Sequence, residues 1–324
     1  MNKEIISVIV TVRNAEKTIG ECIESILNQD YVNFELIIVD ANSTDGTEKK
    51  LKNYKKNKKV KTIYLDKKVG TSEARNIGIK ISKGKFIAFT DSDCKTGRNW
   101  LTELRKGFYE EKTASVGGPN LIPKDDSVKA RCVARVLSFY SKAGSYYVFN
   151  SKEMVEVEHN PTSNSMYRRK VLLELNRFNE RIVSNEDAEL DYKIRKKGFK
   201  ILFNPKAVVY HHRRDSFKKF FHQAKWFGVG RMQAIKLDKG MIEWFRFIPS
   251  IVILILILSV ILSFYFFPAL LFFALVFSIL LISFFFSALY LSLKTKPSYF
   301  FNYFILLGAW FFGYGIGVIE GVFK

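Results

Sequence analysis

The sequence predicts an α/β domain with a Rossmann-like, mostly parallel central sheet, followed by transmembrane helices. Strand-like and helix-like segments alternate four times before residue 92, with the spacing of βα units. Beyond residue 246, no charged residue occurs in residues 247–293 or in residues 297–319. Each stretch is longer than the roughly 20 apolar residues that one membrane-spanning helix needs. These observations together predict a soluble α/β part and a membrane part.

The soluble part begins with four expected strands, at residues 5–10, 34–39, 60–65 and 86–90. The helix after the first strand has apolar residues at i, i+3, i+4, i+7 and i+8, which are Ile19, Cys22, Ile23, Ile26 and Leu27. A basic helix is expected near residues 47–56. Another helix opens at residue 71 or 72, because a threonine and a serine there are good N-caps.

The later elements are less regular. A strand is expected at residues 116–119 and a poorly patterned helix at 125–147, and a polar loop covers 159–164. A helix begins at Asn185 and ends at Gly198, because glycine commonly terminates helices. Two short strands follow, at residues 199–203 and 207–210.

Two carboxylates, Asp91 and Asp93, follow the buried fourth strand. In open α/β sheets, ligands bind at the carboxyl ends of the strands. Two oxygen donors at this spacing can hold one Mg²⁺ or Mn²⁺, which commonly shares its shell with substrate phosphates. A polar turn is the competing interpretation of Asp-Ser-Asp. His211 is a further candidate ligand, although a packed or exposed histidine is the more common case.

Three other polar positions stand at strand or helix ends. Asp40 ends the second strand and can accept hydrogen bonds from a base ring, and Arg75 lies near a helix start where it can meet a diphosphate. Asp187, at a helix start, can take a proton from an acceptor hydroxyl, or can simply complement the helix dipole. Arg213 and Arg214 are further candidates to stabilise a leaving diphosphate.

Composition narrows the cellular setting. The net charge is +20, nearly all of it before residue 247, which suits anionic lipid or phosphate-bearing substrates. No zinc-finger or RNP signature accompanies this charge, so no nucleic-acid partner is expected. The three cysteines are scattered, as in a reducing compartment. The chain starts directly with a strand-like run, so no signal peptide is expected.

The membrane part is expected to hold about three helices, within residues 247–324, with Pro268 near the first turn. Lys294 and Lys296 form the charged connection, and the positive-inside rule places them in the cytoplasm. Three crossings then put the soluble domain in the cytoplasm and Lys324 outside. Residues 216–246 contain an amphipathic basic helix, expected either to lie at the membrane interface or to pack on the domain.

Taken together, these segments resemble the family 2 glycosyltransferases, which have the nucleotide-sugar-binding GT-A fold. The resemblance covers about residues 4–232, and the GT-A domain is expected to comprise residues 1–232. Order and spacing both agree across the matching segments, which are residues 7–14, 37–40, 43–47, 74–78, 84–93 and 185–187. Ala41 stands where a second carboxylate often follows Asp40, and residues 223–226 only partly match the Gln-x-x-Arg-Trp of processive synthases.

The resemblance implies an inverting enzyme that uses a UDP- or GDP-sugar and a divalent cation, Mn²⁺ or Mg²⁺. It implies Asp40 at the base, Asp93 at the metal and Asp187 as the general base. From the residues themselves, Asp91 and His211 join Asp93 as candidate metal ligands, and Glu186 is the neighbour of the catalytic Asp187. Donor binding is expected of residues at strand ends and at one helix start: Thr11, Arg13, Asp40, Asn42, Arg75, Asp91 and Ser92.

The C-terminal anchor suits enzymes that glycosylate polyprenyl-linked or dolichyl-linked saccharides at the cytoplasmic face of the cell membrane. We therefore expect a multi-pass membrane enzyme with that activity. Two alternatives stay open. One is a polyprenyl-phosphate sugar synthase, whose acceptor is a phosphate. The other is a non-catalytic, membrane-bound sugar-nucleotide sensor.

Overall fold

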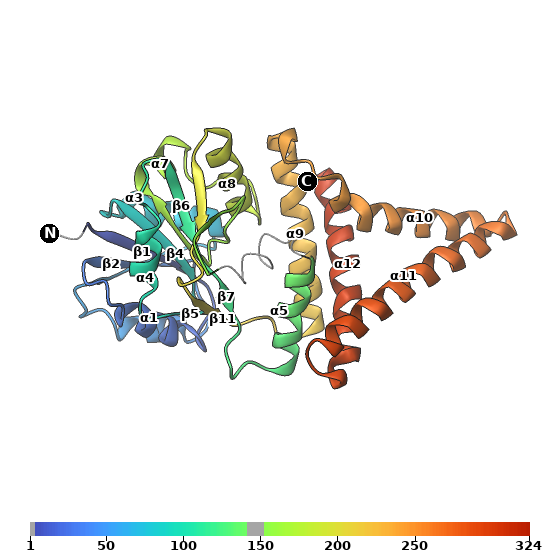
Figure 1. Cartoon of the computed structure of the whole chain (residues 1–324), viewed down its shortest axis with the longest axis horizontal. Coiled ribbons are helices and arrows are strands. Elements are labelled where there is room, and N and C mark those ends of the chain that lie inside the picture. The colour runs from blue at the N-terminus through green and yellow to red at the C-terminus, as the bar shows by residue number, and fades with distance from the viewer. Residues whose placement is uncertain (1–3, 141–151) are drawn as a thin grey trace. The chain divides into compact units, whose positions relative to one another are not determined.

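The computed structural model describes residues 4–140 and 152–324, which form two compact units (Figure 1). Unit 1 comprises the described residues of 1–124 and 141–212, and unit 2 comprises residues 125–140 and 213–324. The helix expected at residues 125–147 is present as α5 (Val128–Tyr140), which begins three residues later than expected. Residues 141–147 lie outside the described residues.

Unit 1 is built on an eight-stranded sheet in the order β3-β2-β1-β4-β9-β6-β10-β8. Strands β1 to β4 pair in parallel, which confirms the predicted α/β fold class. A strand that the sequence did not indicate, β9, runs antiparallel between β4 and β6. The strands are β1 (Ile6–Val12), β2 (Phe34–Asp40), β3 (Val60–Tyr64), β4 (Phe86–Asp91), β6 (Thr113–Gly117), β8 (Val155–Glu156), β9 (Asn164–Arg168) and β10 (Lys200–Phe203).

Helices cover both faces of this sheet, and each face has its own apolar core. Residues Ile19, Cys22, Ile23 and Ile26 are buried on one face, as their helical spacing predicted. The other face packs against apolar residues of α3, α7 and α8. The helices of unit 1 are α1 (Ile19–Leu27), α2 (Thr47–Lys52), α3 (Thr71–Ile81), α4 (Trp100–Lys106), α7 (Arg169–Glu174) and α8 (Glu186–Lys196).

A second sheet of three short strands, β5 (Cys94–Thr96), β11 (Val209–His211) and β7 (Asn120–Leu121), completes unit 1. Strand β11 pairs antiparallel with β5, so that His211 lies opposite Cys94. This pairing brings the end of unit 1 back to the residues that follow β4.

Unit 2 contains α5 and four longer helices: α9 (Phe217–Leu237), α10 (Ile248–Ser263), α11 (Phe267–Leu293) and α12 (Phe300–Phe323). Short 3₁₀ turns, at Lys239–Met241, Trp244–Phe247 and Pro297–Tyr299, connect them. Three segments are long and apolar enough to cross a membrane, which are Trp244–Ser263, Phe267–Leu293 and Pro297–Phe323. This agrees with the predicted three apolar helices. Pro268 lies in the first turn of α11, directly after the first connection.

Unit 1 ends at residue 212, and α9 packs along α12 inside unit 2. The expected GT-A domain of residues 1–232 stays a prediction. The buried side of α9 includes Phe220, Ala224 and Gly228, which belong to the apolar stripe predicted for this helix. Another helix therefore covers this stripe.

Candidate active site

The carboxyl ends of β1, β2 and β4 lie side by side at one edge of the sheet. Thr11 pairs in register with Val39 on one side and Asp91 on the other, and Val12 pairs with Asp40. The strand-end residues that the sequence singled out therefore meet at this edge, as expected for a parallel sheet.

The loops after β1 and β2 are tied together at this edge. Asp40 is buried, and its Oδ1 accepts hydrogen bonds from the backbone N–H and the hydroxyl of Ser43 at 3.0 and 2.6 Å. Burial raises the pKa of Asp40, while those two hydrogen bonds oppose the rise. Arg13 is exposed, and so is Asn42, whose φ of 60° allows a tight turn. Arg13, Asp40 and Asn42 thus lie at the carboxyl ends of β1 and β2, where two hydrogen bonds from Ser43 hold the Asp40 carboxylate.

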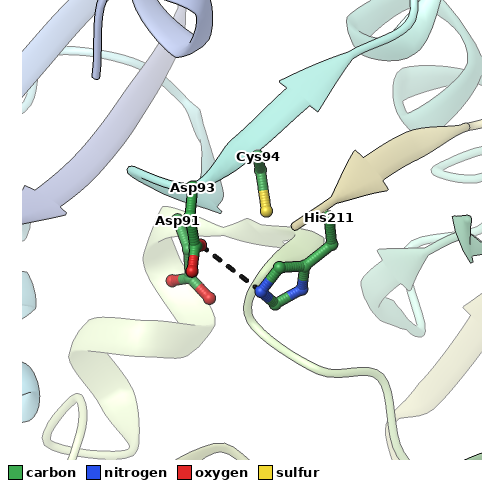
Figure 2. Close-up of side chains that lie close together, drawn as sticks. All are labelled: Asp91, Asp93, Cys94 and His211. Carbon is green, nitrogen blue, oxygen red and sulfur yellow. Dashed lines mark ion pairs between the residues drawn. The ribbon is translucent and has the colours of Figure 1, made fainter. Parts of the chain in front are cut away.

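Possible metal donors lie close together at the carboxyl end of β4, the strand that pairs with β1. One ligand atom from each of Asp91, Asp93, Cys94 and His211 lies within 4.8 Å of the others. Figure 2 shows the two carboxylates and the imidazole converging from β4, the turn after it, and β11. The Nε2 of His211 is 3.3 Å from the Oδ1 of Asp93, and Ser92 separates the two aspartates in the sequence. The structure thus brings together the three predicted ligands.

The chemistry of this donor set fits a hard or borderline divalent ion. Carboxylate oxygens suit Mg²⁺ and Mn²⁺, and an imidazole nitrogen favours Mn²⁺ over Mg²⁺. Burial and the two neighbouring aspartates raise the pKa of the Cys94 thiol. A thiol is also a soft ligand, whereas Mg²⁺ and Mn²⁺ prefer oxygen donors. The set that fits is therefore Asp91, Asp93 and His211.

The guanidinium of Arg75 is buried between two carboxylates. It contacts Asp91 Oδ1 at 3.2 Å and makes a short ion pair with Glu186 Oε1. Burial raises the pKa of Glu186, and the positive charge of Arg75 opposes that rise. The sequence reasoning gave Arg75 a diphosphate as its partner. In the structure its partners are carboxylates, which link the start of α8 to the metal-ligand candidate Asp91.

Asp187 lies next to Glu186 in a different environment. Asp187 is partly exposed, and its Oδ2 accepts a hydrogen bond from the backbone N–H of Thr162 at 3.2 Å. Its Oδ1 accepts from the backbone N–H of Ala188 at 2.8 Å. Glu186 is buried and enclosed by its ion pair, whereas the carboxylate of Asp187 is partly exposed.

A further carboxylate, Asp191, was not predicted from the sequence and supports the loop that contacts Asp187. It lies one turn after Asp187 on α8 and is fully buried. Its Oδ2 lies 2.8 Å from His159 Nδ1 and accepts a hydrogen bond from the backbone N–H of Asn160 at 2.9 Å. Asp191 thereby holds the loop that carries Thr162. The i, i+4 spacing of the two aspartates was the available signal, because it places both on one helix face.

The remaining candidates divide between the units. The backbone N–H of His212, in unit 1, donates to the backbone carbonyl of Asp93 at 3.0 Å. Arg213 and Arg214 belong to unit 2, where the backbone N–H of Arg213 donates to Asp126 at 3.3 Å.

Comparisons with known proteins agree with this architecture. A dolichyl N-acetyl-α-D-glucosaminyl phosphate 3-β-D-2,3-diacetamido-2,3-dideoxy-β-D-glucuronosyltransferase of Methanococcus voltae is 30% identical over 249 residues, covering 74% of this chain and 76% of the relative. The Escherichia coli enzyme WfgD, a UDP-Glc:α-D-GlcNAc-diphosphoundecaprenol β-1,3-glucosyltransferase, is 38% identical over 44% of this chain and 56% of its own length.

Among solved structures, the mannosyltransferase PcManGT of Pyrobaculum calidifontis, in complex with GDP-Man and Mn²⁺, matches with a TM-score of 0.57 and 19% identity. The match covers 71% of this chain and 64% of that protein, so it supports the fold. The sequence model named Glycosyl transferase family 2 matches residues 7–175, about half of the chain. With its GT-A fold and its homology to the archaeal transferase, this chain belongs to glycosyltransferase family 2.

Proposed function

We propose that this protein transfers a sugar, with inversion, from a UDP- or GDP-sugar to a hydroxyl of a polyprenyl-linked saccharide at the cytoplasmic face of the cell membrane. The observation that carries the proposal is the cluster of Asp91, Asp93 and His211 at the strand ends, within one compact unit that also holds Asp187. The archaeal and bacterial relatives, named for dolichyl- and undecaprenol-linked acceptors, support the acceptor class.

The chain's own residues suit an in-line displacement at the anomeric carbon. Asp187 accepts the proton of the acceptor hydroxyl, whose oxygen forms the new bond to that carbon while the bond to the diphosphate breaks. A divalent ion held by Asp91, Asp93 and His211 would neutralise charge on the leaving diphosphate. Arg75 fixes the side chain of Asp91, so its role is to orient a ligand.

The donor prediction concerns binding. A nucleoside diphosphate sugar should raise the melting temperature only when Mn²⁺ or Mg²⁺ is present, because binding to the native state stabilises it by mass action. A thermal-shift panel of UDP-, GDP- and dTDP-sugars, each with Mn²⁺ and with EDTA, measures this. At ligand concentrations about 100-fold above Kd, the stabilisation is about 2.7 kcal/mol. An equal shift with EDTA would contradict the metal assignment, and no shift with any donor would contradict the function.

The ligand prediction concerns His211. His211→Ala should weaken Mn²⁺ binding about 10-fold to 100-fold, because it removes one of three candidate donors and leaves both carboxylates. Isothermal titration of the purified protein with Mn²⁺, in the presence of UDP or GDP, measures it. His222→Ala is the matched control, because the cluster of possible donors comprises Asp91, Asp93, Cys94 and His211 and does not include His222. Equal Mn²⁺ affinity in both variants would remove His211 from the ligand set.

A further inference from the structure

The last helix, α12, lies along α9 throughout its second half. A Cβ added to Gly317 would lie 2.0 Å from the backbone oxygen of Lys225, and one added to Gly321 would lie 3.1 Å from the backbone of Val229. The contacts advance together along both chains, so the two helices run parallel. They continue to the last turn, where Lys236 Nζ donates to the backbone oxygen of Val322 at 2.8 Å. The end of α12 therefore lies beside the end of α9.

The same helix joins the two ends of the α10–α11 hairpin. At the start of α12, Phe300 packs edge-to-face against Phe285 of α11, with ring centroids 5.2 Å apart. About four turns further along α12, the hydroxyl of Ser250, in the first turn of α10, donates to the backbone oxygen of Gly315 at 3.1 Å. Figure 1 shows the result as a triangle in unit 2, with α12 as the base and α10 and α11 meeting at the opposite corner.

This geometry differs from a bundle of three successive membrane crossings. In such a bundle the second half of α12 would lie beside the end of α10 and the start of α11. Here it lies beside the start of α10, and the last turn of α12 lies beside the helix that precedes α10. The chain thus ends near the level at which it enters the hairpin.

The charged residues of this region lie outside the α10–α11 hairpin. Residues 247–293 carry no charged side chain, whereas the two ends of α12 are charged. Glu320 pairs with Lys225 of α9 at 2.6 Å, and Lys294 and Lys296 precede the other end. A charged side chain is unfavourable at the centre of a membrane helix, so charges collect outside the hydrocarbon. Both ends of α12 therefore suit water.

The turn of the hairpin suits hydrocarbon. The side chains of Phe264, Tyr265 and Phe266 are 82%, 88% and 62% exposed. The backbone N–H groups of Tyr265 and Phe266 both donate to the carbonyl of Leu262, at 3.0 and 2.9 Å. These donors are satisfied without water, as a lipid-facing turn requires. By contrast, protein already buries half of the most apolar 18-residue stretch of the α12 segment.

We propose that α10 and α11 enter the bilayer as one hairpin that leaves on the side where it entered, and that α12 lies with α9 at the membrane surface on that side. The partner of the exposed apolar hairpin is the hydrocarbon of the bilayer. The C-terminus then lies on the same side as Lys294 and Lys296, whereas three crossings would place it on the opposite side. The proposal rests on unit 2 alone and does not require the proposed transferase activity.

Cysteine labelling of the whole chain in cells tests this arrangement. Lys324→Cys and Lys296→Cys each add one thiol, and the unmodified protein gives the background, because Cys22, Cys94 and Cys132 are buried. A membrane-impermeant maleimide is applied to intact and to permeabilised cells. Both variants should label at least about 10-fold more after permeabilisation, and to the same extent.

Other results have defined meanings. Labelling of Lys324→Cys in intact cells, with Lys296→Cys protected, would overturn the hairpin and restore three crossings. Failure of Lys324→Cys to label after permeabilisation, when Lys296→Cys labels, would place the C-terminus in hydrocarbon and would also overturn it. Labelling of both in intact cells would support the hairpin but contradict the cytoplasmic side given under the proposed function.

Discussion

Replacing Asp93 by asparagine should abolish nearly all sugar transfer while leaving the fold intact. The carboxylate lies in the turn after β4, within 4.8 Å of the other candidate ligands and 3.3 Å from His211 Nε2. The amide keeps the shape but loses the charge that binds a divalent ion. Mutation of a residue that only hydrogen-bonds to a metal ligand commonly lowers metal affinity or activity by about 10-fold to 100-fold. Loss of a ligand itself should therefore lower kcat/KM by at least about 100-fold.

The measurement is transfer at saturating donor over a series of Mn²⁺ concentrations, together with the melting temperature. Glu174→Gln is the control, because this exposed carboxylate ends the short helix α7, which follows β9 at the opposite end of β4 from Asp91. Near-normal transfer by Asp93→Asn in Mg²⁺ or Mn²⁺ would show that the metal assignment is wrong. A large fall in melting temperature would instead assign the residue a structural role.

The sequence predicted the parts of this site that depend on local pattern. The buried run before Asp91 marks a strand end, and strand ends in a parallel sheet meet at one edge. For that reason Asp40 and Asp91 could be placed near one another without coordinates. The stripe of α1 was equally readable, because helical periodicity alone identifies its buried side.

Contacts between distant segments could not be read in this way. Arg75 and Glu186 are 111 residues apart in the sequence, and no pattern in the residues around either one predicts their ion pair. His211 reaches the metal candidates only because β11 pairs with β5. Strand β9 was hidden because it follows a polar loop directly.

The membrane part shows a different limit of sequence reasoning. An apolar stripe such as that of α9 looks the same whether it faces lipid or another helix. In the structure, glycines of α12 allow the two helices to approach closely, which selects the helix partner. Hydropathy likewise finds three helices of sufficient length but carries no information on the direction of the last one.

The second large effect concerns the catalytic base. Asp187→Asn should bind the donor normally and transfer about 10² to 10⁴ times more slowly, which is the usual cost of losing a general base. The partly exposed carboxylate is held by the backbone N–H groups of Thr162 and Ala188, and the amide has nearly the same shape. Donor affinity by titration and single-turnover transfer measure the two effects separately.

Glu186→Gln is the neighbour that separates catalysis from stability. Glu186 is buried and pairs with Arg75, and removing one partner of a buried pair is strongly destabilising. We therefore expect this variant to lower the melting temperature by several degrees, since roughly 1 kcal/mol corresponds to about 2–4 °C in domains of this size. Asp187→Asn should leave the melting temperature nearly unchanged.

Three outcomes of this pair are informative. If Asp187→Asn fails in single turnover and Glu186→Gln retains transfer at a temperature where it is folded, Asp187 is the base. If the folded Glu186→Gln variant fails and Asp187→Asn does not, the two roles are exchanged. If neither change affects transfer, the acceptor needs no deprotonation, which is the behaviour expected of an anionic lipid phosphate, and the hydroxyl acceptor proposed here is wrong.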